Sequence, residues 1–106
     1  YKDRMIAGLL ENLVYLDLRR RGYDVYVGKQ DDKEVDFVAI LRDEKIYVQV
    51  TYQLSSSATV EREFAPLLSI SDHYPKYVVS MDDFFRENIE GVKHCFIADF
   101  LLSEKL

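Results

Sequence analysis

Residues 34–51 read EVDFVAILRDEKIYVQVT, two apolar segments separated by the charged residues Arg42, Asp43 and Glu44. Each segment has the alternation and the β-branched or aromatic content that are typical of strands. The segments cover residues 34–41 and 46–53. Because the charged break between them is short, the sequence predicts an antiparallel hairpin.

The first strand of this hairpin carries a carboxylate among apolar residues. Alternation predicts two faces, with Asp36, Val38 and Ile40 on one and Val35, Phe37 and Ala39 on the other. Opposite residues of a hairpin lie equally far from its turn, so Asp36 is expected at the level of Gln49 through Thr51. A carboxylate in an apolar strand is costly unless it is paired or metal-bound, which makes Asp36 a candidate site residue.

On the N-terminal side of the hairpin, apolar residues recur at helical spacing over residues 3–21, and Gly22 ends the pattern. Residues 23–28 are β-branched and aromatic, and residues 29–32 are polar turn material. We therefore expect a helix followed by a strand that joins the hairpin in an antiparallel meander.

On the C-terminal side, a serine loop at residues 55–57 precedes a second helix, with Thr59 as its expected N-cap and Glu61 and Glu63 near its positive end. Pro66 lies inside the helical pattern, where it predicts a kink or a restart. His73, Tyr74 and Pro75 are expected to end this helix.

The remaining chain predicts two more strands. Residues 77–81 form a nearly continuous apolar run, which indicates a strand that is buried on both faces and pairs in parallel. Residues 82–91 form an acidic connection, in which Phe84 and Phe85 are expected to fix the loop to the core. A last strand is predicted at residues 94–97 and a helical turn at residues 98–102.

The length of 106 residues and a hydrophobic content of 48% suit one α/β domain over residues 1–106, with a mixed central sheet flanked by helices. The chain begins at Tyr1 and enters a helical pattern almost at once, which suggests a piece of a longer polypeptide. The single cysteine, Cys95, excludes an internal disulfide and favours a cytoplasmic location. No apolar run is long enough to span a membrane.

The net charge of -5 disfavours long-range attraction of a phosphate backbone. Any contact with nucleic acid would have to be local. The basic cluster Arg19, Arg20 and Arg21 falls at a predicted helix end, where positive charge complements the helix dipole. We therefore assign this cluster a structural role.

Glu11 falls beside the apolar sector of the first helix, from where it can point along the sheet. Magnesium takes oxygen ligands, usually one or two carboxylates completed by water and phosphate. Glu11, Asp36 and the amide oxygen of Gln49 are therefore a candidate Mg²⁺ site. The alternative, which spacing alone leaves open, has Glu11 solvated and Asp36 hydrogen-bonded within the hairpin.

A helix glutamate, a strand aspartate and Gln49-Val50-Thr51 on the next strand resemble the PD-(D/E)xK motif of restriction-endonuclease-like nucleases, and the element order resembles their αβββαβ core. The chain more closely resembles an uncharacterised C-terminal domain of prokaryotic AAA-type ATPases. The matching segments are Gly8-Leu9-Leu10-Glu11-Asn12, Gly22-Tyr23-Asp24-Val25-Tyr26, Lys33-Glu34-Val35-Asp36-Phe37 and Tyr47-Val48-Gln49-Val50. This resemblance implies a parent-chain ATPase domain as partner, because the four glycines here form no phosphate-binding loop.

The chain departs from the nuclease motif at two positions. The motif has an acidic residue where this chain has Gln49, and a lysine where it has Thr51. Losing one placed electrostatic group typically costs about 10²- to 10³-fold in rate, so both losses together argue against efficient cleavage. Arg62 is a candidate for the displaced cation, although ion pairing with its glutamate neighbours competes, and Lys33 is a weaker candidate.

Three hypotheses follow from these residues. The first is a degenerate nuclease-fold domain that serves an AAA-type ATPase as a recognition or assembly module. The second is an active Mg²⁺-dependent DNA or RNA nuclease that uses Glu11, Asp36 and Gln49 as ligands and Arg62 as the cation. The third is a pure protein-interaction domain, which the acidic charge favours.

Overall fold

The computed structural model describes residues 2–30, 33–83 and 88–103. No helix among them is long and apolar enough to cross a membrane. The elements in chain order are α1 Lys2–Arg20, β1 Asp24–Gln30, β2 Lys33–Leu41, β3 Glu44–Val50, α2 Ser57–Leu68, β4 Lys76–Ser80, β5 Asn88–Ile89, β6 Val92–Phe96 and α3 Ile97–Leu102.

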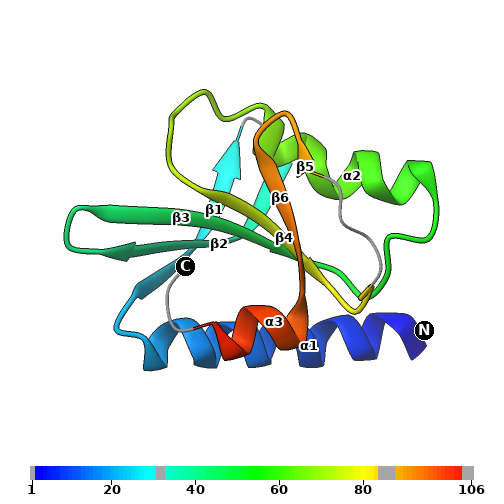
Figure 1. Ribbon diagram of the computed structural model, residues 1–106, viewed down its shortest axis with the longest axis horizontal. Coiled ribbons are helices and arrows are strands. Elements are labelled where there is room, and N and C mark those ends of the chain that lie inside the picture. The colour runs from blue at the N-terminus through cyan, green and yellow to red at the C-terminus, as the bar shows by residue number, and fades with distance from the viewer. Residues whose placement is uncertain (1, 31–32, 84–87, 104–106) are drawn as a thin grey trace.

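The strands form one mixed sheet in the order β1-β2-β3-β4-β6-β5. β1, β2 and β3 pair as the predicted antiparallel meander, and β4 pairs in parallel with both β3 and β6. Every residue of β4 is buried, as the apolar run at residues 77–81 predicted, but the strand ends at Ser80 and Met81 is exposed. Helices α1 and α3 lie side by side on one face of the sheet, and α2 covers the other (Figure 1). The predicted α/β class with a mixed sheet flanked by helices is confirmed.

Two apolar clusters hold the helices to the sheet, one on each face. The cluster on the α1 and α3 face includes Leu10, Val14, Leu18, Ala39, Ile46, Val48, Val79, Ile97 and Phe100. The cluster on the α2 face includes Val35, Tyr47, Leu54, Phe64, Leu67, Val78 and Val92. Burial of such side chains is the main favourable contribution to folding, so each helix is fixed by its apolar face.

An irregularity in β2 changes the faces that alternation predicted. The register runs from Tyr26↔Val38 to Gly28↔Val35, so β2 holds one residue more than β1 over this interval. Val35 consequently packs with Val38 on the α2 face, whereas Phe37 packs on the α1 face. The prediction that Val35 shares a face with Phe37 is wrong because the extra residue breaks the alternation.

Helix α2 differs from its sequence prediction at both ends. Ser56, and not Thr59, is the N-cap, and its Oγ accepts the Thr59 N–H at 3.2 Å. Glu61 and Glu63 therefore lie beyond the first turn. Pro66 is accommodated inside the helix, which ends at Leu68, well before the predicted end near residues 73–75. A proline inside a helix lacks the N–H that would bond to the carbonyl four residues earlier, so it weakens the turn before it.

The boundaries near the C-terminus also differ from the sequence prediction. The predicted acidic connection contains the short strand β5, β6 begins at Val92 and not at residue 94, and α3 begins at Ile97. The expected contact of Phe84 and Phe85 with the core lies outside the described residues. The predicted third strand ends at Val50 instead of residue 53, although the Thr51 N–H still donates to the Val79 carbonyl at 2.9 Å.

The arginines at the C-terminal end of α1 have the predicted structural role. Arg20 and Arg21 contact the two carboxylate oxygens of Asp17 at 2.7 and 2.8 Å. The Arg21 guanidinium also donates to the Phe100 carbonyl at 2.9 Å and to the Ser103 carbonyl. It therefore joins the end of α1 to the end of α3.

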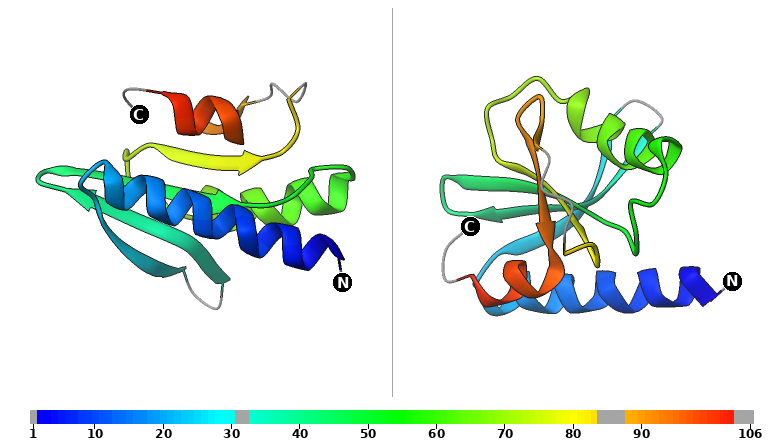
Figure 2. Two further views of the ribbon diagram at one scale, coloured as in Figure 1. Left: turned by 90° about the horizontal axis from the view of Figure 1, so that it is seen from below. Right: turned by 45° about the vertical axis from the view of Figure 1, so that its right-hand side comes forward.

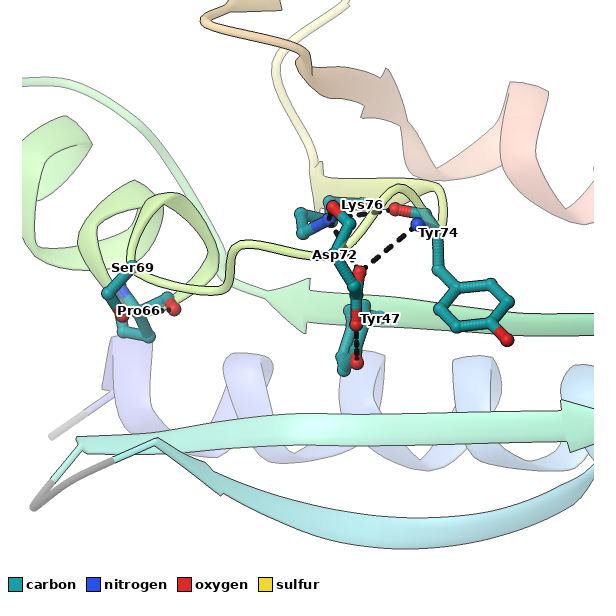
Figure 3. A network of polar contacts seen from close by, with 6 residues as sticks. All are labelled: Tyr47, Pro66, Ser69, Asp72, Tyr74 and Lys76. Atoms are coloured by element: carbon teal, nitrogen blue, oxygen red, sulfur yellow. Dashed lines mark hydrogen bonds and ion pairs between the residues drawn. The ribbon is translucent and has the colours of Figure 1, made fainter.

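A polar network fixes the connection between α2 and β4 against β3 (Figure 3). The Lys76 ammonium donates to the Asp72 carboxylate at 3.0 Å and to the Asp72 and Tyr74 carbonyls at 2.8 and 2.9 Å. The Tyr47 hydroxyl donates to Asp72. Burial alone would raise the pKa of Asp72, but hydrogen bonds from Tyr47 and Lys76 outweigh it and hold that pKa below its ordinary value.

We predict that Lys76→Met lowers the free energy of unfolding by about 3 kcal/mol, because it leaves the Asp72 carboxylate and two carbonyls without their buried donor. Lys93→Met, at an exposed position of β6, is the matched control and should change stability by less than about 0.5 kcal/mol. Urea unfolding checks both. Strictly additive effects of Lys76→Met and Asp72→Asn would contradict the network, since coupled residues deviate from additivity.

Candidate functional site

The five predicted site residues lie around the end of the sheet where β2 begins and β3 ends. A cavity of about 580 Å³, here called the α1 groove, lies between α1, β1 and β2, and its lining includes Leu9, Glu11, Tyr15, Val27, Asp36 and Phe37. The α2 groove lies between the sheet and α2, and its lining includes Lys33, Asp36, Gln49, Glu61, Arg62 and Glu63. Asp36 lines both grooves.

Asp36 forms two reciprocal hydrogen bonds with β3, here called the Asp36 clasp. Its N–H donates to the Gln49 amide oxygen at 2.6 Å, and its carboxylate accepts the Val50 N–H at 2.8 Å. The regular β2–β3 ladder ends at the pair Phe37↔Val48. Beyond the last backbone pair, side-chain hydrogen bonds thus hold the two strands together. The alternative prediction that Asp36 is hydrogen-bonded within the hairpin is confirmed.

Gln49 connects β3 to α2 as well as to β2. Its side chain is buried, and its amide nitrogen donates to the Glu63 carbonyl at 3.5 Å. An amide oxygen has two lone pairs, one of which here accepts the Asp36 N–H. Gln49 therefore has a structural role that is independent of its predicted metal ligation.

The site contains an excess of carboxylates. Burial, as the largest cause, and the nearby charges of Glu11, Glu63 and Glu34 together raise the pKa of Asp36 to about 7, against the opposing effect of the Val50 hydrogen bond. Burial also raises the pKa of Glu11 and of Glu63. Proximity of like charges and desolvation both disfavour ionisation, so this end of the sheet attracts cations and protons.

Glu63 is the residue that the sequence interpretation missed. It was expected near the positive end of α2, but it lies in the second turn and turns toward the site, where Glu11 acts on its charge. The signal was present, because Glu63 is three residues after Val60 and four before Leu67, both of which pack on the sheet.

Of the three predicted metal ligands, only Glu11 and Asp36 line the α1 groove. Their oxygen donors suit Mg²⁺. Within residues 2–30, 33–83 and 88–103, however, no three His, Cys, Asp or Glu side chains converge closely enough to hold a metal ion. The described carboxylates therefore do not form a complete metal site, and a hydrated Mg²⁺ ion would have one or two of them as ligands.

Thr51 and Arg62 line a third cavity, next to Glu63. Thr51 is buried, and its side chain carries a neutral hydroxyl. Arg62 lies in the second turn of α2, with 70% of its side chain exposed and its Nε 3.5 Å from the Glu63 carboxylate. Arg62 is thus ion-paired with Glu63, and this pairing competes with a role of Arg62 as the displaced cation.

We predict that Asp36→Asn stabilises the domain at pH 8 and that this gain shrinks as the pH falls to 5.5. Because the pKa of Asp36 is about 7 in the folded domain and lower in the unfolded chain, protonated Asp36 favours the folded state. This contribution to the free energy of unfolding is full in acid and is lost as the pH rises through 7. Between pH 8 and pH 5.5 the change in the gain is on the order of 2 kcal/mol, because only the interval from pH 5.5 to 7 lies below the raised pKa. Melting temperatures across this range check the effect, and Asp43→Asn in the exposed hairpin turn is the control. A gain that is equal at both pH values would contradict the explanation.

The sequence matches no family model and no solved structure. It is 40% identical over 101 residues to an uncharacterised protein of Haemophilus influenzae, a match that covers 95% of this chain and 24% of that protein. It is also 42% identical over 59 residues to an uncharacterised protein of Methanocaldococcus jannaschii, covering 52% of this chain and 13% of that protein. The chain thus spans about a quarter or less of the length of the relatives it matches.

Proposed function

We propose that this domain is a degenerate nuclease-fold module that recognises or assembles with a partner and does not cleave phosphodiesters efficiently. The observation that carries the proposal is the Asp36 clasp, in which the two residues at the centre of the nuclease-like motif hold β2 to β3. These side chains have a structural reason to be present that does not require catalysis.

The charge around the clasp also supports this proposal. Hydrolysis of a phosphodiester builds negative charge that a metal ion and a fixed cation stabilise. The charged residues that act on Asp36 are Glu11, Glu34 and Glu63, and the nearby Arg62 is ion-paired and mostly exposed. Together with a net charge of -5, this environment favours a positively charged partner over a nucleic acid.

The relatives support a role within a larger protein. Because the match covers 24% of the Haemophilus influenzae protein, a domain of this kind is one part of a much longer chain there. From the resemblance to a C-terminal domain of AAA-type ATPases, we propose that the rest of the longer chain contains an ATPase domain and that the protein is cytoplasmic. The module would then connect the ATPase to its target or to its own assembly.

A second candidate is a metal-dependent nuclease, and the gathering of carboxylates around Asp36 favours it. Magnesium would relieve their mutual repulsion and supply the Lewis acid of the reaction. Glu11 and Asp36 would bind the ion, with Gln49 adding an amide oxygen. Arg62 would have to leave Glu63 and turn toward the substrate, which costs that ion pair.

We predict no cleavage by the wild-type domain above the background of Asp36→Ala. The assay incubates supercoiled plasmid, single-stranded DNA and RNA with millimolar Mg²⁺ or Mn²⁺ and resolves the products on gels. Metal-dependent cleavage that disappears in Asp36→Ala would overturn the proposal. If that cleavage also falls in Arg62→Gln but not in Arg42→Gln, at the hairpin turn, the second candidate would be correct.

We further predict that Gln49→Glu binds Mg²⁺ about tenfold more tightly than the wild-type domain, because affinity for hard cations rises with the number of charged oxygen ligands. Isothermal titration with MgCl₂ measures the two affinities. The control is Gln53→Glu, which adds the same charge at an exposed position. Equal affinities for all three proteins would show that Gln49 does not face a cation site.

A further inference from the structure

We propose that the α1 groove binds an extended polypeptide segment that carries a lysine or arginine next to apolar side chains. The inference rests on the proposed recognition function, and it names the chemistry of the partner and the surface that receives it. The occupant is a segment of another domain or protein. Four features of the described residues support it: size, apolar lining, charge and an open strand edge.

The groove has the size and the apolar lining of a binding site for side chains. Its volume of about 580 Å³ lies within the range of ligand pockets, roughly 300 to 1,000 Å³. The Tyr15 and Phe37 rings, whose centroids are 6.1 Å apart, lie along it. Leu9 and Val27, at its borders, are 64% and 72% exposed. Apolar surface gathered in a groove in this way is typical of interaction sites.

The apolar surface continues from the groove along α1. Met5, Leu9, Leu13 and Leu16 are all exposed and recur at intervals of four, four and three residues. This spacing places them in one row on the helix. Figure 2 shows α1 running across the sheet with one side uncovered by other elements. A partner seated in the groove thus finds further apolar contact on α1.

The charges in the groove select a basic partner. Its charged lining residues among those the structure describes are Glu11, Glu34 and Asp36, and none of the described lining residues is a lysine or arginine. A lysine or arginine from a partner would neutralise carboxylates that now repel one another, whereas a phosphate backbone would add to the repulsion. The aliphatic stem of such a side chain would also cover Val27 and Leu9.

The position of β1 favours an extended segment. In the described part of the sheet β1 is the outer strand and pairs with β2 alone. An outer strand presents N–H and C=O groups to which an extended peptide can add as a further strand. Val27, which lines the groove, belongs to this strand, so one segment can pair with β1 and place alternate side chains in the groove.

The test uses a phage-displayed library of short random peptides, selected on the immobilised domain. The most enriched sequence is then made as a fluorescent synthetic peptide, and its affinity is measured by anisotropy. We expect enriched peptides to combine lysine or arginine with leucine, isoleucine or aromatic residues. Their affinity should fall as salt is added, because the charges are partly screened.

Two neighbouring residues of β1 provide matched variants. Val27 lines the groove, whereas Tyr26 is also exposed but is not part of its lining. Val27→Lys should weaken binding of the selected peptide at least about tenfold, since it adds a like charge and removes apolar contact, while Tyr26→Lys should change it less than about twofold. Circular dichroism verifies that both variants fold. Leu9→Lys provides a second change in the same groove.

Several results would overturn the inference: no enriched peptide, enrichment of acidic peptides, or binding that is equal in Val27→Lys and Tyr26→Lys. Single-stranded DNA or RNA that binds the wild-type domain, and binds Val27→Lys more tightly, would assign the groove to nucleic acid instead. These results are separate from the cleavage assay. Nuclease activity would contradict the proposed function, but it would not change the expected difference in peptide affinity between Val27→Lys and Tyr26→Lys.

Discussion

The geometry of the site depends on one constraint, which is that β2 and β3 remain joined beyond the end of their regular ladder. The regular β2–β3 ladder ends at the pair Phe37↔Val48, and beyond it Asp36 and Gln49 hold the strands together with one side chain each. A buried carboxylate is costly, but two hydrogen bonds to a strand offset part of that cost. The two strands lie between α1 and α2, so the shape of both grooves depends on the contact between Asp36 and Gln49.

Much of the sheet could be predicted from the sequence, because local patterns determine it. The charged break near Asp43 sets the register that brings Asp36 to Gln49 and Val50, and the apolar run of β4 predicts a strand buried on both faces. The irregularity in β2 could not be predicted in this way. It depends on the partner strand, where Gly28 lies so close to Val38 that an added Cβ would be 2.5 Å from the Val38 Cγ2 atom.

The site was predicted less completely than the sheet, because its electrostatics arise between elements. Glu11, Asp36 and Gln49 were found as candidates, but the sequence could not show that the Gln49 amide binds two backbone groups. Glu63 could have been found from its spacing to Val60 and Leu67, and the sequence interpretation overlooked it. Since Ser56 and not Thr59 caps the helix, the position of each glutamate relative to the helix start differs from the expectation.

The contact of Arg21 with the last residues of α3 has a consequence for the order of folding. It joins groups that are 79 and 82 positions apart in the chain, and closing so long a loop has a large entropic cost unless the intervening sheet has already formed. Docking of α3 onto the end of α1 is therefore a late event, and its release is an early step of unfolding. The exchange rate of the α3 amide hydrogens would then report on local opening, while those of β3 and β4, at the centre of the sheet, report on global unfolding.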